Sequence, residues 1–270
     1  MKRIKAVMGR VAVSLVALAG AIALAACAIG SAEAEVINDV FNVSGPTRVE
    51  ASIDNGNIEV SADGSQGDAV RVTATVWDRE RVNYHTEREG DTVKIVASVN
   101  GGAGSSGQED RRADIRVSVP QDTELVLKTS NGSIKVSGVT GQVSASTSNG
   151  AVSVSRVSGD VEVEASNGRV ELDDVTGQVK VETSNGPIGF NGTLRPGSSN
   201  SLKSSNGDVE VTLMDTAGVE VDAAASNGRV RSQLPVALSG TARDNELVGT
   251  IGDGGSRLEI RVSNGSITIK

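Results

Sequence analysis

The chain has 270 residues with a formal charge of −8, and aromatic residues make up only 1% of it. Its first 26 residues carry four basic residues and no acids, so the remainder has a formal charge of −12, which excludes nucleic acid as an expected partner. With so few large side chains a rounded core is hard to fill, whereas stacked Val and Ile layers fill a thin core easily.

The N-terminus has the pattern of an export signal. A basic segment, 2–10, precedes an apolar stretch, 11–24, that is too short for a comfortable transmembrane span. The stretch ends in Leu24-Ala25-Ala26-Cys27, which resembles a bacterial lipobox, cut between Ala26 and Cys27 so that the cysteine thiol takes a diacylglycerol. Cys27 is the single cysteine of the chain, so no internal disulfide can form. We therefore expect residues 1–26 to be a lipoprotein signal peptide and Cys27 to anchor the protein in a membrane of the bacterial envelope.

An ordinary secretory signal is the alternative, because Ala32-Glu33-Ala34 also offers a small-x-small cleavage site. Ala28, rather than Asp, follows the cysteine. By resemblance to diderm lipoproteins, this residue permits sorting to the outer membrane where the organism has one.

The mature chain is expected to begin with a tether, 27–40, followed by an N-terminal β region, 41–129, that caps a repeat array. Residues 48–53 alternate between polar and apolar, and the turn Asp54-Asn55-Gly56 leads to Ile58 and Val60. This phrase is an early copy of the repeat described below.

The segment 69–99 has a different pattern. Residues 69–77 and 93–97 alternate as strands, and a charged stretch, 78–91, joins them and contains Tyr84 and His85. The pattern predicts a β-hairpin or two long strands joined by a polar segment. A further strand, 115–119, is stopped by Pro120.

The tripeptide Ser-Asn-Gly recurs seven times between residues 130 and 265. The first four copies are 18 residues apart, the next two intervals are 21, and the last is 37, close to two repeats with one signal lost. Asn and Gly both tolerate positive φ, so these residues are predicted to form structural turns. They are Asn131, Gly132, Asn149, Gly150, Asn167, Gly168, Asn185, Gly186, Asn206, Gly207, Asn227, Gly228, Asn264 and Gly265.

Each 18-residue unit splits into two halves of nine, because Gly141, Gly159 and Gly177 mark a second turn. Apolar residues stand two and four positions after each glycine, so every half is one turn and one strand with a single apolar face. Stacking such units about 4.8 Å apart buries a continuous stripe. The sequence therefore predicts an all-β protein, with a parallel β-helix or β-solenoid over 130–270. Stacked Asn side chains could form a hydrogen-bonded ladder.

An antiparallel β meander is the alternative fold, because Asn-Gly is also the strongest short hairpin signal. A meander needs no fixed repeat length, however, and here the 18-residue spacing persists through four copies.

These repeats resemble a known family. The runs 117–120, 127–136, 249–252 and 258–267, with the internal Ser-Asn-Gly copies, are similar to the bacterial β-strand-repeat family labelled "putative adhesin", a domain of unknown function. The resemblance covers about 41–270. It implies the fold and offers no catalytic residues to carry over.

Few residues are suited to catalysis or metal binding. His85 is the only histidine and lies in a charged segment, which argues against nucleophilic catalysis and zinc. Outward carboxylates such as Glu162, Glu164, Glu171 and Glu182 share their faces with Lys135, Lys180, Arg156 and Arg169. A calcium-binding β-roll is a minor alternative, with Asp253-Gly254-Gly255 as its nearest match. We expect no enzyme activity, cofactor, metal or small-molecule substrate.

Two functions are therefore considered. The first is a lipid-anchored structural or adhesin-like module that binds a protein or cell-surface partner. The second, which leans on the family resemblance, is an envelope-stress accessory protein whose 69–99 segment docks a partner through Trp77 and Tyr84.

Overall fold

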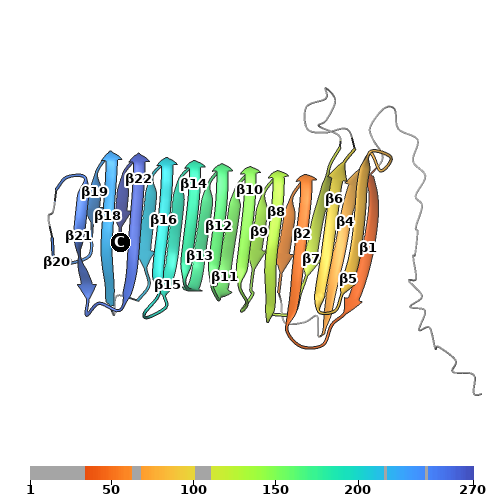
Figure 1. Ribbon diagram of the computed structural model, residues 1–270, viewed down its shortest axis with the longest axis horizontal. Coiled ribbons are helices and arrows are strands. Elements are labelled where there is room, and N and C mark those ends of the chain that lie inside the picture. The colour runs from red at the N-terminus through yellow and green to blue at the C-terminus, as the bar shows by residue number, and fades with distance from the viewer. Residues whose placement is uncertain (1–33, 63–67, 101–110, 216–217, 241–242) are drawn as a thin grey trace, which may run out of the picture. The chain divides into compact units, whose positions relative to one another are not determined.

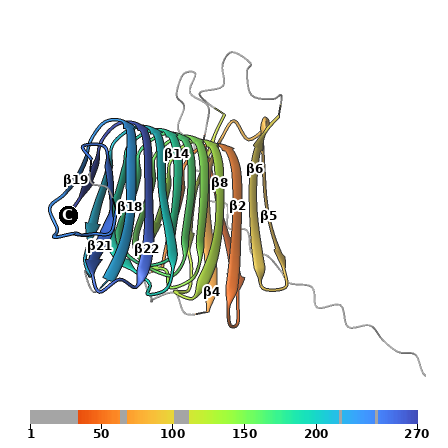
Figure 2. The same cartoon turned by 60° about the vertical axis from the view of Figure 1, so that its left-hand side comes forward.

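Alternating apolar residues, chiefly Val, form strands throughout the described part of the chain. The computed structural model describes residues 34–62, 68–100, 111–215, 218–240 and 243–270, all within one compact unit, and no helix occurs in these ranges. The predicted signal peptide, its cleavage site and Cys27 lie outside the described residues. The strands form two large mixed sheets, named sheet A and sheet B below, which face each other across a shared core (Figures 1 and 2).

Sheet A has eleven strands among the described residues. In spatial order they are β1 (Ala34–Asn42), β4 (Ala69–Trp77), β7 (Ala113–Ser118), β3 (Ile58–Ser61), β9 (Ile134–Ser137), β11 (Val152–Ser158), β13 (Val170–Gly177), β15 (Ile188–Leu194), β17 (Val209–Leu213), β23 (Ile267–Ile269) and β19 (Val230–Ser232).

Sheet B has twelve strands over the same ranges. Their spatial order is β20 (Ala237–Leu238), β21 (Glu246–Gly252), β18 (Gly218–Asn227), β22 (Ser256–Asn264), β16 (Ser199–Asn206), β14 (Val179–Asn185), β12 (Val161–Asn167), β10 (Val143–Asn149), β8 (Thr123–Asn131), β2 (Thr47–Asn55), β6 (Thr92–Val99) and β5 (Val82–Glu89).

From β8 to β17 the chain alternates between the sheets, and from β10 onward each of these strands pairs in parallel with the strand two places earlier. Val143 stands opposite Leu125 on one side and Val161 on the other, so the sequence repeat of 18 is also the step between neighbouring strands. The antiparallel meander is therefore wrong for this segment. Antiparallel pairs occur only towards the two ends of the described sheets, in β1–β4–β7, β5–β6 and β18–β21–β20.

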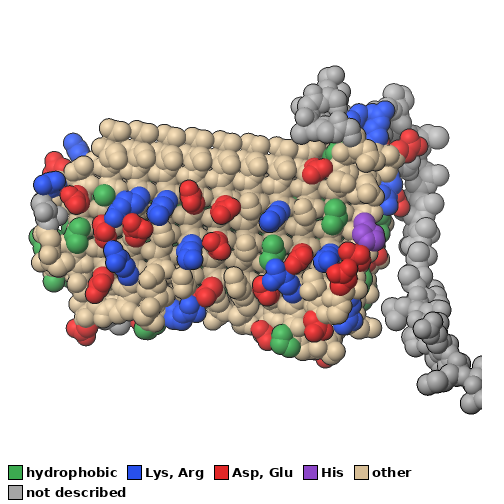
Figure 3. Space-filling view, in the orientation of Figure 1, with side chains coloured by type: hydrophobic (Ala, Val, Ile, Leu, Met, Phe, Trp, Pro, Cys, Tyr) green, Lys and Arg blue, Asp and Glu red, His purple; other side chains and the backbone are tan. Residues whose placement is uncertain are grey.

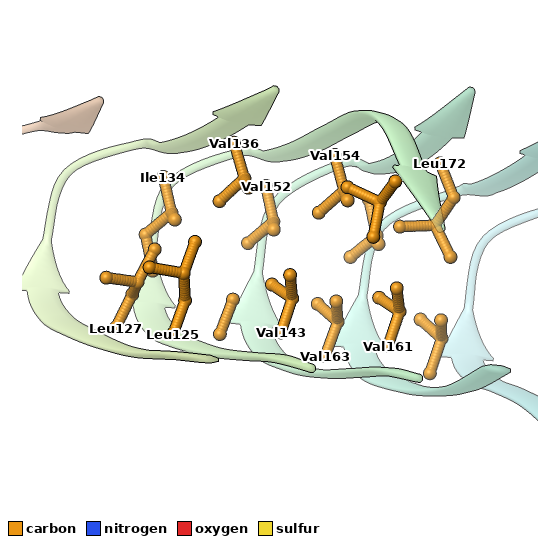
Figure 4. Packing of buried hydrophobic residues seen from close by; sticks show 14 of the residues in the cluster. Leu125, Leu127, Ile134, Val136, Val143, Val152, Val154, Val161, Val163 and Leu172 are labelled. Atoms are coloured by element: carbon orange, nitrogen blue, oxygen red, sulfur yellow. The ribbon is translucent and has the colours of Figure 1, made fainter. Parts of the chain in front are cut away.

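The core lies between the two sheets and consists of columns of Val, Ile and Leu (Figure 4). In the unit 132–145, Ile134, Val136, Val143 and Ala145 stand two and four positions after a glycine and are all buried, as the pattern predicts. The same offsets recur in the next unit, so like residues stack on like residues. Each unit alone would expose its apolar face, and only the neighbouring units remove that face from water.

Backbone contacts at the corners explain the repeated glycines. Gly150 adopts a φ of +153°, and a Cβ there would overlap the carbonyl oxygen of Gly132 in the preceding unit. Its own N–H donates to the carbonyl of Asn167 at 2.9 Å. Gly159, in the second half of the unit, is also closed to a side chain because the backbone of Gly141 lies against it. Both corners therefore bring neighbouring backbones too close for any side chain.

The N-terminal region departs from the predicted boundaries. Residues 34–40, predicted as part of the tether, belong to β1, because Ile37 and Phe41 pack against the core. The array begins before residue 130, because its strand β8 begins at Thr123 and alternate residues of that strand are buried. The charged stretch 78–91 contains strand β5, Val82–Glu89, which forms a hairpin with β6. Val82 and Tyr84 are its inward residues, and in the sequence they stand in a mostly charged and polar segment, which obscures the strand pattern.

The stacking order differs from the chain order near both ends. The early repeat copy, β2–β3, lies between β6–β7 and β8–β9. Likewise β22–β23 lies between β16–β17 and β18–β19. The 37-residue interval is therefore not two successive coils with one signal lost. It contains β19, β20 and β21, after which the chain returns to fill an interior position.

Replacing Gly150 with Ala tests the corner geometry. We expect Gly150→Ala to lower the free energy of unfolding by about 3 kcal/mol, because the new methyl group meets backbone at a φ unfavourable to side chains. Urea-induced unfolding followed by circular dichroism measures the change.

The matched control is Gly189→Ala in β15. A Cβ at Gly189 meets only side-chain atoms of Glu171, at 3.9 Å, so the loss there should stay within about 0.5 kcal/mol. Equal losses in the two variants would contradict the backbone-contact argument.

Candidate functional site

The Ser-Asn-Gly residues lie along one margin of sheet B, where β8, β10, β12, β14, β16, β22 and β18 all end at an Asn. Figure 3 shows this upper margin as an uncharged band, with charged side chains spread over the face below it. The Asn side chains form one ladder, in which each Nδ2 donates to the Oδ1 of the next Asn at 2.8–3.0 Å, in the order Asn227, Asn264, Asn206, Asn185, Asn167, Asn149, Asn131 and Asn55. The amides thus bond to each other.

The outward face of sheet B groups charges of one sign. Glu164 stands opposite Glu182 on neighbouring strands, and Glu162 stands two residues before Glu164 on the same strand, opposite Lys180. Lys203 stands opposite Arg261 in the same way. Neighbouring strands lie about 4.8 Å apart, so these like charges are close enough to repel each other. Such pairs oppose folding, which makes them a candidate for a binding function.

The two groups flank one shallow hollow of about 480 Å³. The acidic group consists of Glu162, Glu164 and Glu182, and the basic group of Lys203, Arg257 and Arg261; all but Arg261, which lines the adjoining hollow, contribute to this one. Each side also has one residue of the opposite sign in the hollow: Lys180, opposite Glu162, on the acidic side, and Glu259, between Arg257 and Arg261 on β22, on the basic side. An open hollow with a negative side and a positive side can hold a macromolecular segment of the complementary polarity.

Ion pairs engage the basic group more than the acidic group. Arg261 lies 2.8 Å from Asp222 and 3.3 Å from Glu259, and Lys203 lies 3.6 Å from Glu259. The hydrogen bond from Arg261 lowers the pKa of Asp222, and the same bond raises the pKa of Arg261. In contrast, Glu162, Glu164 and Glu182 have no ion pair within 4.0 Å among the described residues. The acidic side therefore retains its charge for a cationic partner.

Part of this site was accessible from the sequence. Lys203 and Arg261 each stand three residues before a ladder Asn, as Glu164 and Glu182 do, so their common row was readable. The sequence did not show that Lys203 and Arg261 are neighbours, because their contact depends on the insertion of β22 beside β16. The structure also separates two groups that the sequence analysis placed together. Glu171 and Lys135 lie on sheet A, whereas Glu162 and Lys180 lie on sheet B.

The predicted docking residues of the 69–99 segment are only partly available. Tyr84 is buried and donates a hydrogen bond to Asp39 at 3.1 Å, and burial raises its pKa. Trp77 is half-buried, with the Arg112 guanidinium 4.2 Å from its ring centroid. Docking through the Tyr84 ring is therefore wrong. His85 is exposed, with its Nε2 3.5 Å from Glu87.

The geometry shows no arrangement for metal chemistry within the described ranges. No group of three or more His, Cys, Asp or Glu side chains there could hold a metal ion. Asp253, the residue considered for calcium, is exposed in the turn between β21 and β22. The described residues also include no helix long and apolar enough to cross a membrane.

One family model and several solved structures are similar to this chain. Residues 160–270 match the family model described as Toastrack DUF4097, which confirms the resemblance to a bacterial domain of unknown function.

A crystal structure described as a "putative adhesin" from Bacteroides fragilis matches with a TM-score of 0.52 and 14% identity, covering 87% of this chain and 97% of that chain. A "putative cell adhesion protein" from Clostridium sporogenes has a TM-score of 0.44 at 14% identity, with coverages of 88% and 99%. A "putative lipid binding protein" from Parabacteroides distasonis has a TM-score of 0.44 at 12% identity, with coverages of 89% and 99%. At 14% identity, the likeness to the Bacteroides fragilis structure concerns the fold alone. No curated protein matches the chain.

The ion pair of Asp222 predicts an acid dependence of stability. Because Arg261 lowers the folded pKa of Asp222, this pair stabilises the protein above about pH 4, the usual aspartate range, and the contribution is lost as the pH falls through the folded pKa. We expect Asp222→Asn to show a smaller loss of stability than the wild type between neutral pH and acid below about pH 4. Urea midpoints across this range measure the difference.

Ser201→Ala serves as the control, since Ser201 lies on the same face of sheet B and has no titratable side chain. Its acid dependence should follow the wild type. If Asp222→Asn also follows the wild type, the Asp222–Arg261 pair does not contribute to stability.

Proposed function

We propose that this protein is a non-enzymatic, adhesin-like module of the bacterial envelope that binds a macromolecular partner through the outward face of sheet B. The observation that carries the proposal is the hollow between the acidic and basic groups, where like charges stand on neighbouring strands. A purely structural face gains nothing from such pairs, whereas a partner of complementary charge would neutralise them.

The fold supports this proposal by holding the face rigid. We propose that the array is a parallel β-solenoid with coils of about 18 residues, supported by the constant register and the Asn ladder. Backbone contacts fix the strand spacing, so charges three residues before each Asn stay in one row. The fold neighbour from Bacteroides fragilis is itself described as a "putative adhesin".

The partner is proposed to be a protein or another surface macromolecule with adjacent cationic and anionic groups. Residues Glu164 and Glu182 would meet its cations, and Lys203 and Arg261 its anions. Charge complementarity of this kind sets orientation and association rate more than affinity, so binding should weaken with salt. The envelope-stress alternative has less support, because the buried Tyr84 cannot present its ring.

We also propose lipid anchoring at Cys27, with 1–26 as the signal peptide and a tether shortened to 27–33 by the start of β1. The other boundaries, proposed from the sequence as 41–129 and 130–270, then become 34–122 for the N-terminal β region and 123–270 for the array. The support is the lipobox-like Leu24-Ala25-Ala26-Cys27. Two or three acyl chains, at about 0.8 kcal/mol per buried methylene, anchor a protein stably.

Site-specific photo-crosslinking in intact cells tests the proposed face. A photoreactive residue replacing Ser201, which lines the hollow, should yield crosslinked partner bands. Adding Lys203→Glu and Glu182→Lys should reduce those bands at least about tenfold, because the two charges that face each other where the acidic and basic groups meet are exchanged.

The matched control places the same photoreactive residue at Ser153 on the outward side of β11 in sheet A. This position should give few crosslinks. Equal labelling from both sheets, or bands that persist after charge reversal, would refute sheet B as the binding face.

Anchoring is tested by Cys27→Ser and cell fractionation. The wild type should remain with membranes and carry lipid on an N-terminal Cys27 by mass spectrometry, whereas the variant should lose the lipid and appear in the soluble fraction. A mature N-terminus at Glu35 would instead establish cleavage after Ala34 and contradict the anchor.

A further inference from the structure

Strand β1 is the exception among the four sheet edges of the described residues. At the far end of the sheets, β19 has three residues and β20 has two, so neither offers a long template. The edge strand β5 carries Glu87, Arg88 and Glu89, and charged edges resist pairing. In contrast, β1 runs for nine residues, pairing with β4 on one side only among the described strands. Such an edge is a ready template for another strand.

The outward side of β1 carries no charge. Its residues are Ala34, Val36, Asn38, Val40 and Asn42, and Val36 and Val40 are 59% and 52% exposed. They are two of the five large hydrophobic residues exposed in the described chain. Both valines therefore present apolar surface at an unpaired strand edge.

The two acids of β1 face the opposite way and are already engaged. Asp39 accepts hydrogen bonds from Tyr84 at 3.1 Å and from Thr86 at 2.9 Å. Glu35 lies 3.5 Å from Arg79. These contacts hold the two carboxylates on the inward side of β1, so they place no charge on its outward side.

We propose that β1 pairs with β1 of a second copy of this chain, antiparallel and about a two-fold axis through Asn38, to join the two A sheets. In this register Val36 of each copy lies opposite Val40 of the other, and Asn38 lies opposite Asn38. The strand sequence is thus self-complementary, as an isologous contact requires.

Charge selects this register over its neighbours. Slippage by one residue turns the valines to the inner side, so only shifts that preserve the faces are relevant. A two-fold axis through Asp39 would place Asp39 opposite itself, and an axis through Ile37 would place Glu35 opposite Asp39. The axis through Asn38 instead places Glu35 opposite Phe41 and Asp39 opposite Ile37. It also pairs all nine residues.

The end of the core would gain cover in this arrangement. Ile37 and Phe41 point inward from β1 but remain only half-buried, because no further strand continues sheet A among the described residues. A second β1 would extend the sheet beyond them. The proposed interface lies at β1, at one edge of sheet A, whereas the hollow lies over β12, β14, β16 and β22 of sheet B. The dimer and the proposed partner therefore use separate surfaces.

Sedimentation equilibrium tests the dimer in the full chain carrying Cys27→Ser, which removes association through lipid. The mass should approach two chains as concentration rises. Val36→Lys with Val40→Lys should raise the dissociation constant at least about tenfold, because Lys at each position would stand directly opposite Lys of the other copy in two cross-strand pairs. The control, Met214→Lys with Leu238→Lys, changes two residues that are 62% and 56% exposed elsewhere and should leave the dimer intact. A monomeric parent at every concentration would overturn the proposal, as would a dimer unaffected by the β1 variant.

Disulfide crosslinking tests the register in the same Cys27→Ser chain. Asn38→Cys places a thiol opposite itself and should give a crosslinked dimer under mild oxidation. Asn42→Cys, on the same outward side, faces Ala34 of the other copy and should crosslink at least about tenfold less, because bonded cysteine Cα atoms lie within about 7 Å. Equal crosslinking at the two positions would contradict the antiparallel arrangement.

Discussion

Contact between backbones at the glycine corners is the constraint on which the other features of this protein depend. At Gly150 and Gly159 the preceding unit lies so close that no side chain fits. The contact fixes the strand spacing and aligns each unit with the next. Aligned units bring Asn to Asn along the margin and Val to Val within the core. The small aliphatic core, the amide ladder and the rows of surface charge therefore share one cause.

The sequence predicted what is local to each unit. Glycine spacing identified the corners, and the offsets of Ile134 and Val136 identified the buried face. It did not predict which units touch, because every unit offers nearly the same faces to its neighbours. The insertions of β2–β3 and β22–β23 were missed for this reason. Strand β5 was missed because Val82 and Tyr84 stand in a segment of mostly charged and polar residues, and its strand pattern is evident only against β6.

The charged face shows how such an insertion creates a property that no single unit contains. Lys203 and Arg261 are separated by 58 residues, yet they are direct neighbours because β22 lies beside β16. The acidic row, in contrast, arises from consecutive repeats, Glu164 and Glu182. A polarised surface therefore combines regular repetition with one non-local pairing, and only the first part could be predicted from the sequence.

The interior position of β22–β23 also bears on how the chain can assemble during synthesis. Strand β18 reaches the stack only through β22, which the ribosome makes later. Until residues 256–269 emerge, β16–β17 must present an uncovered apolar layer, and β18–β19 can pair only with later strands. Growth of the stack one unit at a time is thus possible through β17 and must then wait. The closing step is a long-range one, which is slow and leaves strand edges exposed to other chains meanwhile.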